Sequence, residues 1–445
     1  MSKTQTRRRW LRFTRSLAAF VASALWLIAP APDADAVLVA RQAAAKGAER
    51  ASAGVPFSPE RGPISEVPPS PARGLAFVFE QLGLDDYLRA FPALLSAPRP
   101  GELGGPEQAA GWRSQLAFYD GRVAFQRIYG VEDGLGPHYN DTSCANCHLQ
   151  PTLGGGGRDM DHGVTGHGPA WTDGDAVGVR KHAIAGFELE VIEGPTAKMR
   201  TPPLYGLGRL DSIDEAARAA IEDPDDGDHD GVRGRRAWRG SGSARRPARF
   251  GHKANEWTLA HFCAGALNDE IGITNVVRRQ PRADADAVAD PEASSDDVQR
   301  IIAYVRGLAP PQPAPSTKES ERGRAHFAAI GCATCHQPSL GGVDGAYSDT
   351  LLHDLGPGLA GLPDGSATAQ DWRTPPLWGL RLRQRYLHDE RAATLVEAIA
   401  AHAGEASAAR SASASRSLPT EAQGRTPASG ASAARSVSGS PRPRA

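Results

Sequence analysis

Four of the five cysteines fall into two motifs of identical spacing, and these motifs carry the clearest chemical signal in the chain. Both read Cys-x-x-Cys-His, and their residues are Cys144, Cys147 and His148, and Cys332, Cys335 and His336. On one helical turn this spacing presents two thiols that can add to the two vinyl groups of one haem, with the adjoining histidine beneath the iron. The motifs therefore predict two covalently attached c-type haems, with the cysteines as attachment points and the histidines as proximal iron ligands.

Two other chemistries use the same residue types. A redox-active Cys-x-x-Cys pair of the thioredoxin kind needs no histidine and lies in a βαβ context. A zinc site could combine two cysteines and one histidine with a fourth ligand. The presence of two identical motifs, each followed by the same downstream block, favours the haem interpretation over both.

The downstream block is an internal repeat. The segment that begins at Arg200 reads RTPPLYGL and the segment that begins at Arg373 reads RTPPLWGL, a match at seven of eight positions. Each copy follows one Cys-x-x-Cys-His motif, so the chain is expected to contain two related modules.

The sixth iron ligands are less clearly indicated. Of the three methionines, Met1 belongs to the leader, Met160 and Met199 follow the first motif, and none follows the second. Met199 is the candidate distal ligand of the first haem, and His353 and His388 are candidates for the second. Further candidates for the second haem are His402, Tyr347 and Tyr386. An open sixth position would instead admit peroxide or another small oxidant, and this is the difference between a catalyst and an electron carrier.

Two weaker signals concern a cation and a thiol. Asp226, Asp228 and Asp230 form the D-x-D-x-D-G opening of a calcium loop, although Ala237 replaces the glutamate expected at the twelfth position. The competing interpretation is a solvated acidic loop. Cys263 lies in the apolar stretch LAHFCAGAL and is expected to be a small buried side chain rather than a reactive thiol.

Composition limits the class of protein. The chain has 445 residues with 6% aromatic residues and a mean hydropathy of −0.39, which excludes a multi-span membrane protein. With 50 basic and 51 acidic residues scattered along the chain, nothing indicates a nucleic-acid partner. Helical periodicity dominates over strand alternation, for example in 255–273 and 294–308, the latter with Ser294 or Ser295 as N-cap and Gly307 at its end. The expected fold class is mainly α, with long Gly/Pro-rich loops.

The pattern along the chain predicts six segments. Residues 1–36 resemble a signal peptide, with a basic start, a short apolar run and the small-x-small pattern Ala34-Asp35-Ala36, so we expect export to the periplasm and no stable membrane span after cleavage. The remaining segments are a Pro-rich linker (37–73), an N-terminal haem domain with insertions (74–309), a second Pro-rich linker (310–320), a C-terminal haem domain (321–410) and a disordered low-complexity tail (411–445).

Several long segments resemble one known family. The stretch 121–157, GRVAFQRIYGVEDGLGPHYNDTSCANCHLQPTLGGGG, is similar to the first haem region of the bacterial di-haem oxidoreductase, putative peroxidase family, also called CxxC-motif thiol oxidoreductases. Segments 223–235, 249–259, 347–361 and both RTPPL blocks follow in the family's order. The resemblance covers about 110–407. It implies two cytochrome-c-like haem domains, distantly similar to dihaem cytochrome c peroxidases.

The chain departs from the family pattern at three places. Leu355 stands where the family usually has methionine, and Glu390 stands where it usually has glycine. The low-complexity sequence after residue 410 replaces an amphipathic terminal helix, so we expect that helix to be absent and apolar side chains of the LVEAIAAHA segment to be exposed.

Two functions follow from these expectations. The first is an enzyme in which electrons pass from haem to haem and reduce hydrogen peroxide, or oxidise a partner. A distal acid or base for O–O cleavage would come from the interval that holds Glu188, Glu190 and Glu193. The alternatives are a non-enzymatic dihaem electron carrier and a thiol oxidoreductase. The expected partners are a small soluble electron-transfer protein or a quinol-linked donor, and hydrogen peroxide or another small oxidant.

Overall fold

The computed structural model describes residues 98–157, 162–166, 177–189, 194–278 and 286–417. The predicted signal peptide and first linker, Met160, Glu190, Glu193 and the sequence after residue 417 lie outside these ranges. The described part contains nine α-helices and several short antiparallel strands, so it is helix-rich, as predicted, but not purely α. None of the helices described is both long and apolar enough to cross a membrane.

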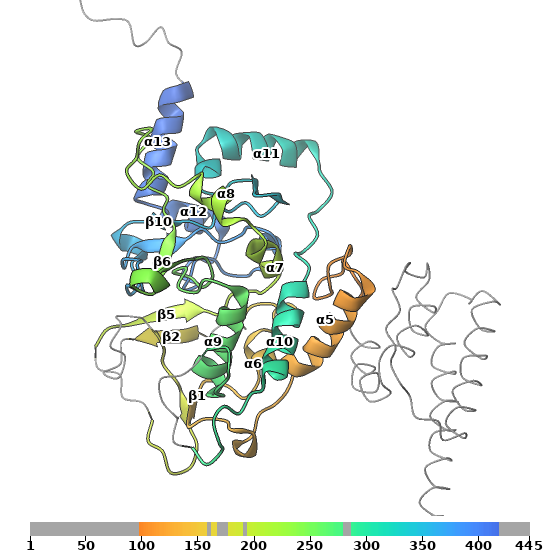
Figure 1. Ribbon diagram of the computed structural model, residues 1–445. Coiled ribbons are helices and arrows are strands. Elements are labelled where there is room, and N and C mark those ends of the chain that lie inside the picture. The colour runs from red at the N-terminus through yellow and green to blue at the C-terminus, as the bar shows by residue number, and fades with distance from the viewer. Residues whose placement is uncertain (1–97, 158–161, 167–176, 190–193, 279–285, 418–445) are drawn as a thin grey trace, which may run out of the picture.

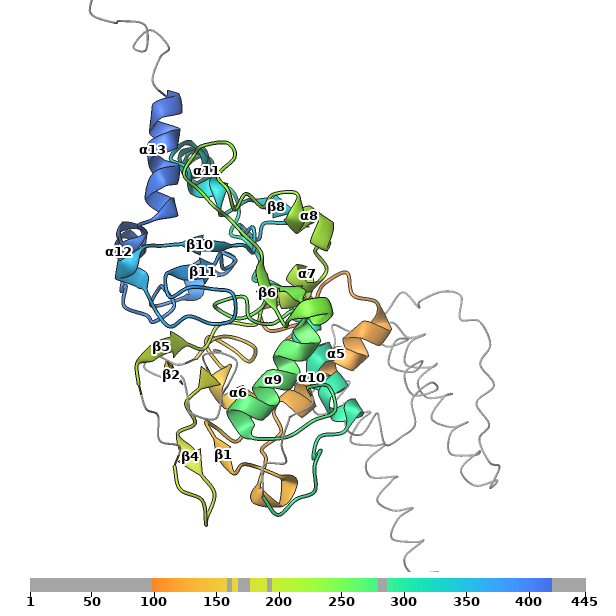
Figure 2. The same ribbon diagram turned by 60° about the vertical axis from the view of Figure 1, so that its left-hand side comes forward.

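One half of the molecule is built on three helices that lie side by side in Figures 1 and 2. They are α5 (Trp112–Phe125), α9 (Leu259–Ile271) and α10 (Ser295–Gly307). Ser294 caps α10 and forms a capping box with Asp297, which confirms the predicted start and end of this helix. Around these helices lie two short helices and five strands: α6 (Cys144–Cys147), α7 (Leu207–Asp211), β1 (His138–Tyr139), β4 (His182–Ala183), β2 (His162–Gly166), β3 (Val177–Gly178) and β5 (Thr196–Arg200).

Helices α5 and α10 cross at close range because a glycine stands at the crossing. A Cβ atom at Gly121 would lie 2.1 Å from the carbonyl oxygen of Arg300, so no larger residue fits. The guanidinium of Arg300 donates to both carboxylate oxygens of Asp120 at 2.7 and 2.8 Å. Beneath this pair, Tyr304 packs its ring between Phe118 and Phe125, with ring centroids 4.9 and 4.8 Å away.

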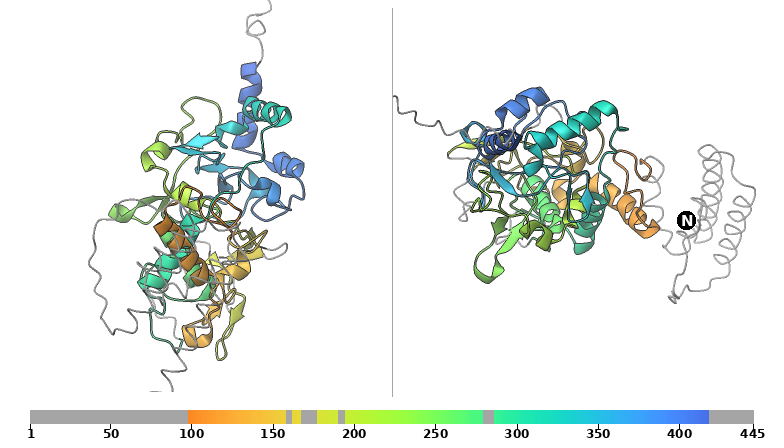
Figure 3. Two further views of the ribbon diagram at one scale, coloured as in Figure 1. Left: turned by 90° about the vertical axis from the view of Figure 1, so that its right-hand side faces the viewer. Right: turned by 90° about the horizontal axis from the view of Figure 1, so that it is seen from above.

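In its described residues, the other half contains four helices and three strand pairs (Figure 3). They are α8 (Glu215–Ala219), α11 (Lys318–Ala329), α12 (Leu395–Ala401), α13 (Glu405–Ser417) and three strand pairs: β6 (Ala237–Arg239) with β7 (Arg246–Ala248), β8 (Ser339–Leu340) with β9 (Val343–Asp344), and β10 (Leu352–Asp354) with β11 (Asp371–Arg373). In the β10–β11 pair, His353 lies opposite Trp372. The strands are too short to form a separate layer, and they serve to position loops.

Packing does not follow the predicted domain boundary at 310–320. Segment 215–257, expected in the N-terminal domain, packs against the C-terminal region, where Arg235 pairs with Leu352 and the amide of Arg373 donates to the carbonyl of His252. In turn, Leu340 and Val343 of the C-terminal region belong to the buried cluster that contains α5, α9 and α10 residues. Residues of both expected domains therefore lie together in two buried clusters. Cys263 belongs to the larger of these clusters and is buried, as predicted.

The prediction of a disordered tail from residue 411 is wrong for residues 411–417, because α13 extends from Glu405 to Ser417. Alanine has the highest helix propensity, and small side chains let this helix approach two glycines closely. A Cβ atom at Gly331 would lie 2.5 Å from the carbonyl oxygen of Ala409, and one at Gly231 would lie 2.6 Å from the Cβ of Ala408. A helix therefore stands where we expected none, but it lacks the apolar residues of the amphipathic helix expected in the family.

Candidate functional site

The first Cys-x-x-Cys-His motif lies on the single-turn helix α6, which Ser143 begins by accepting a hydrogen bond from the amide of Ala145 at 3.3 Å. His148 follows directly. Its Nδ1 lies 3.0 Å from the carbonyl oxygen of Gly155. A carbonyl only accepts, so Nδ1 carries the proton and Nε2 keeps its lone pair for a metal. Burial lowers the pKa of His148, and the carbonyls of Gly155 and Pro202 raise it. Burial is the larger effect, so the pKa is about 4 and the imidazole stays neutral.

The second motif repeats this arrangement. Cys332 begins a short 3₁₀ turn after Gly331, whose φ of +86° suits glycine. The Nδ1 of His336 donates to the carbonyl oxygen of Tyr347 at 2.9 Å, and burial lowers the pKa of His336. Both motif histidines thus have the tautomer and charge of a proximal haem ligand.

The RTPPL repeat holds the two carbonyl partners in place. In the first copy, the amide of Leu204 donates to the carbonyl of Gly154 at 2.9 Å, one residue before Gly155. In the second copy, the amide of Leu377 donates to the carbonyl of Ala346 at 2.9 Å, one residue before Tyr347. The repeat therefore fixes the loop that orients each motif histidine, which gives the sequence match a structural reason.

Sequence analysis missed a third repeated part. Phe125 at the end of α5 has its ring centroid 6.0 Å from that of His148, and Phe327 on α11 lies 6.3 Å from His336. Both phenylalanines stand in the pattern Gly-Arg-x-x-Phe, at 121–125 and 323–327. A comparison of the segments that precede the two motifs would have found it.

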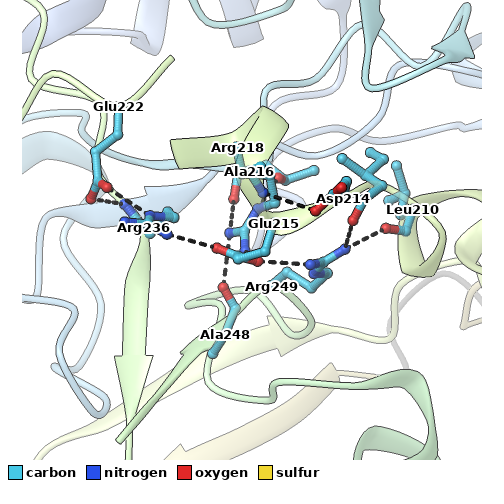
Figure 4. Close-up of polar contacts among 11 residues, drawn as sticks. Leu210, Asp214, Glu215, Ala216, Arg218, Glu222, Arg236, Ala248 and Arg249 are labelled. Atoms are coloured by element: carbon cyan, nitrogen blue, oxygen red, sulfur yellow. Dashed lines mark hydrogen bonds and ion pairs between the residues drawn. The ribbon is translucent and has the colours of Figure 1, made fainter. Parts of the chain in front are cut away.

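A buried arginine on α8, drawn in Figure 4, holds the loop that supports His336. Arg218 on α8 is 0% exposed and donates to the Oγ1 of Thr350 at 2.9 Å and to its carbonyl at 3.3 Å. It also donates to the carbonyl of Ala248 and pairs with Glu215 at 2.8 Å. Tyr347 and Thr350 have φ values of +53° and +61°, which are unfavourable for side chains of these types, so the loop depends on such contacts.

The same carboxylate of Glu215 also binds two further arginines. Arg249 lies 2.7 Å and Arg236 3.1 Å from its oxygens, and Arg236 pairs in addition with Glu222 at 2.6 Å (Figure 4). The cluster therefore joins α8 to the β6–β7 hairpin and, through Arg218, to the loop of the second motif.

Three of the motif thiols have pKa values that are shifted away from reactivity. Burial raises the pKa of Cys144 to about 12, and it also raises the pKa values of Cys332 and Cys335. Redox-active Cys-x-x-Cys pairs have lowered pKa values, because the thiolate is the nucleophile. These environments disfavour thiol exchange as the function of the motifs.

His353 has partners at both ring nitrogens. Its Nε2 lies 2.8 Å from Asp349, and its Nδ1 lies 2.7 Å from Glu405 and 3.5 Å from the sulfur of Cys335. Burial alone would lower the pKa of His353, but the two carboxylates outweigh it and raise the pKa well above 6.5. Ligation of the second iron by His353 stays a prediction, and it requires the ring to leave one carboxylate. The Cys335, Asp349 and His353 ligand atoms lie within 4.8 Å of one another, which also suits a metal ion.

The backbone of His388 contacts the first module. Its carbonyl accepts a hydrogen bond from the amide of Arg200 at 2.7 Å, and Arg200 directly follows half-buried Met199. The backbone of His388 therefore lies beside the residue that follows Met199. The ring of His388 stacks on Trp372 with centroids 3.7 Å apart.

The other candidates are dispersed. His402 ends α12, and its charge would lower the pKa of His336, so it lies in the surroundings of the second motif. Tyr347 supplies the carbonyl to His336, and the hydroxyl of Tyr386 donates to a backbone carbonyl at 3.3 Å. Glu188 is exposed, and its backbone carbonyl accepts a hydrogen bond from His138.

The predicted calcium loop brings three carboxylates together. One oxygen each of Asp226, Asp228 and Asp230 lies within 4.8 Å of the others. Each of the three also accepts a backbone hydrogen bond from within the loop, at 2.9 to 3.2 Å. The geometry is compatible with either interpretation of the sequence.

The residues at both motifs fit a haem. A haem needs two free thiols, a neutral imidazole with its Nε2 lone pair available, and apolar surface for the macrocycle. The first two are described above. Large apolar side chains are exposed directly beside both motifs and on α12, as expected for α12 from the sequence: Leu149, Ile330, Leu395, Val396 and Ile399.

Comparison with known proteins gave one family. The family model described as "Di-haem oxidoreductase, putative peroxidase" matches residues 188–282 and 277–421, together more than half of the chain. A search of curated proteins gave no match. Among solved structures, a chain of Kuenenia stuttgartiensis hydrazine synthase, pressurised with 20 bar xenon, is similar at 15% identity with a TM-score of 0.33, over 81% of this chain and 100% of that chain. That similarity is too weak to bear on fold or function.

Proposed function

The chain belongs to the di-haem oxidoreductase, putative peroxidase family, and we propose that it is a periplasmic c-type dihaem peroxidase that reduces hydrogen peroxide. The family implies two haems. Covalent attachment at both Cys-x-x-Cys-His motifs, export through the N-terminal segment and the choice of peroxide as oxidant are our proposals. The electrons would come from a small soluble electron-transfer protein or a quinol-linked donor.

The observation that carries the proposal is the matched environment of His148 and His336. Each donates from Nδ1 to a backbone carbonyl, at 3.0 and 2.9 Å, and each is kept neutral by burial. Hydrogen bonding to Nδ1 orients a ligating histidine and raises its basicity toward the metal. If the two histidines were only structural, they would not need the same kind of hydrogen-bond partner at equivalent positions of the two repeats.

When bound, the haems supply one-electron transfer at iron, the chemistry that peroxide reduction needs. In the overall reaction, hydrogen peroxide, two electrons and two protons give two molecules of water. The chain's part is to hold the motif histidines neutral and to pack the two modules against each other. Thiol oxidation fits less well, because burial raises the pKa of the motif thiols.

Two finer proposals accompany this function. The cluster of Asp226, Asp228 and Asp230 would hold a calcium ion against α13, because the same loop contains Gly231, which packs on that helix. Met199 would supply the distal ligand of the first haem, and His353 or His388 would supply that of the second.

The test begins with haem content. The full chain is expressed with haem-maturation machinery, and a pyridine haemochrome assay after acid-acetone extraction should give two retained haems per chain. His336→Ala should retain both thioether-bound haems and alter the spectrum of one of them. A ratio near one, or haem lost to the solvent, would contradict covalent dihaem attachment.

Activity is measured next, as turnover of hydrogen peroxide with a reduced small cytochrome or an artificial donor. A high-spin signal in the reduced spectrum would identify an accessible iron. Two low-spin haems that do not react with peroxide in any redox state would instead identify an electron carrier.

A further inference from the structure

A cavity of about 320 Å³ lies between the two RTPPL repeats. The first half contributes Gln150, Gly156 and Arg200 to its lining, and the second half contributes Trp378 and Arg383. The repeats meet here, because a Cβ atom at Gly206 of the first copy would lie 2.4 Å from the ring of Trp378 in the second. The cavity therefore lies at the junction of the two modules.

The cavity has an excess of positive charge. Arg200 is buried, its Nη1 lies 2.6 Å from Glu390, and its Nε is a buried donor with no hydrogen-bond partner. Within the described part of the chain, no hydrogen bond or ion pair involves the guanidinium of Arg383. Burial and the nearby charge of Arg200 lower the pKa of Arg383 to about 10. Since Glu390 neutralises Arg200, one positive charge is left without a counter-charge.

The unpartnered Nε of Arg200 is costly in such a place, because it is buried. A buried donor without an acceptor costs on the order of 1–3 kcal/mol, and more if it is charged. A carboxylate offers two oxygens in the geometry that a guanidinium binds in bidentate fashion, and it would also accept from the Nε of Arg200.

We propose that this cavity binds one carboxylate through Arg383 and the Nε of Arg200, and that its source is a propionate of the haem at the first motif. The cavity adjoins that motif: Gln150 lies two residues after His148, and Gly156 follows Gly155, whose carbonyl orients His148. A soluble carboxylate is the other source of the same chemistry. The inference rests on the proposed dihaem function.

The experiment is a redox titration of the full-length holoprotein by visible spectroscopy. Arg383→Gln removes the charge and Arg383→Lys retains it. The control is Arg381→Gln, because Arg381 is exposed and makes only one hydrogen bond, to the carbonyl of Gln312. The titration is run in chloride and in acetate at matched ionic strength.

A positive charge near a haem disfavours the ferric state. In Arg383→Gln, the ratio of reduced to oxidised protein at a fixed potential should therefore fall about tenfold for one haem, or ~59 mV for a one-electron couple. The other haem should not change, Arg383→Lys should shift much less, and Arg381→Gln should behave as wild type.

The two carboxylate sources give different results. With a propionate, the wild-type potentials are the same in acetate and chloride. With an exchangeable anion, they differ in acetate, and Arg383→Gln abolishes the difference. If Arg383→Gln retains two haems and neither potential nor acetate response changes, the proposal is wrong. Loss of haem from the wild type would instead refute the proposed function.

Discussion

Arg218→Met tests how strongly α8 supports the loop of the second motif. Methionine keeps an unbranched apolar side chain in the same space and removes the charge and every donor. Arg218 makes four hydrogen bonds, of which two reach Thr350, one reaches Ala248 and one reaches Glu215. The substitution therefore isolates the polar contacts of one side chain.

The magnitude follows from the groups left behind. Ala248 is 0% and Thr350 1% exposed, so water cannot replace the lost donors. Each orphaned acceptor costs about 1–3 kcal/mol. The side chain of Glu215 is 30% exposed and keeps its ion pairs with Arg236 and Arg249, so the loss of its pair with Arg218 costs little stability. We expect a decrease in the free energy of unfolding of about 3–5 kcal/mol.

The assay is denaturant unfolding of the holoprotein, followed by far-ultraviolet circular dichroism, with the visible spectrum recorded before unfolding. The loop with positive φ at Tyr347 should relax, so the absorption of the haem at His336 should also shift. Arg306→Met is the control, because Arg306 is 51% exposed and pairs only with Asp211, and it should change stability by less than about 1 kcal/mol. Replacement of a buried ion pair by apolar residues is stabilising in some proteins, so an Arg218→Met variant as stable as wild type would refute this reasoning.

Three further outcomes are expected. Removal of residues 418–445 should leave the melting temperature in scanning fluorimetry unchanged, whereas a stop codon at Glu405 should lower it; equal melting temperatures would show that α13 contributes nothing. Wild type should be more stable than His353→Gln in denaturant unfolding, and this difference in the free energy of unfolding should be full below pH 6.5. The difference should decline as pH rises through the raised pKa of His353, because only the protonated ring pairs with both carboxylates. A difference that grows with pH would contradict this. Phe125→Ala should lower the free energy of unfolding by about 3–5 kcal/mol, because Phe125 is buried. Phe327→Ala should lower it less, because Phe327 is half-buried, and the midpoints of urea unfolding would check this ranking.

The features that sequence predicted well are those encoded within a few residues. The start of α10 at Ser294 and its end at Gly307 follow from a capping box and a terminal glycine. The apolar stretch around Cys263 predicts its burial, because the residues that surround it on α9 have helical spacing. These signals need no knowledge of the rest of the chain.

The features that sequence missed depend on contacts between distant residues. The α13 helix has little apolar content of its own, and its position depends on Gly231, Gly331 and the carboxylate of Glu405, which accepts from the amides of Arg233 and Asp354. Composition therefore predicted disorder, while close packing against glycines produces a helix. The carbonyl partners of the motif histidines are backbone groups, which leave no mark on residue type.

The buried clusters that contain residues of both halves determine how the molecule responds to a destabilising substitution. Leu340 and Val343 pack in the same cluster as the α5, α9 and α10 side chains. Conversely, segment 215–257, which precedes the boundary at 310–320, packs against the C-terminal region. Neither half can lose its structure without exposing apolar surface of the other, so unfolding is expected to be a single cooperative transition. A destabilising substitution beside one motif then lowers the population of folded molecules at both. The two halves are therefore not expected to be exchangeable between related proteins as independent domains. Each half needs side chains of the other to complete its buried interior.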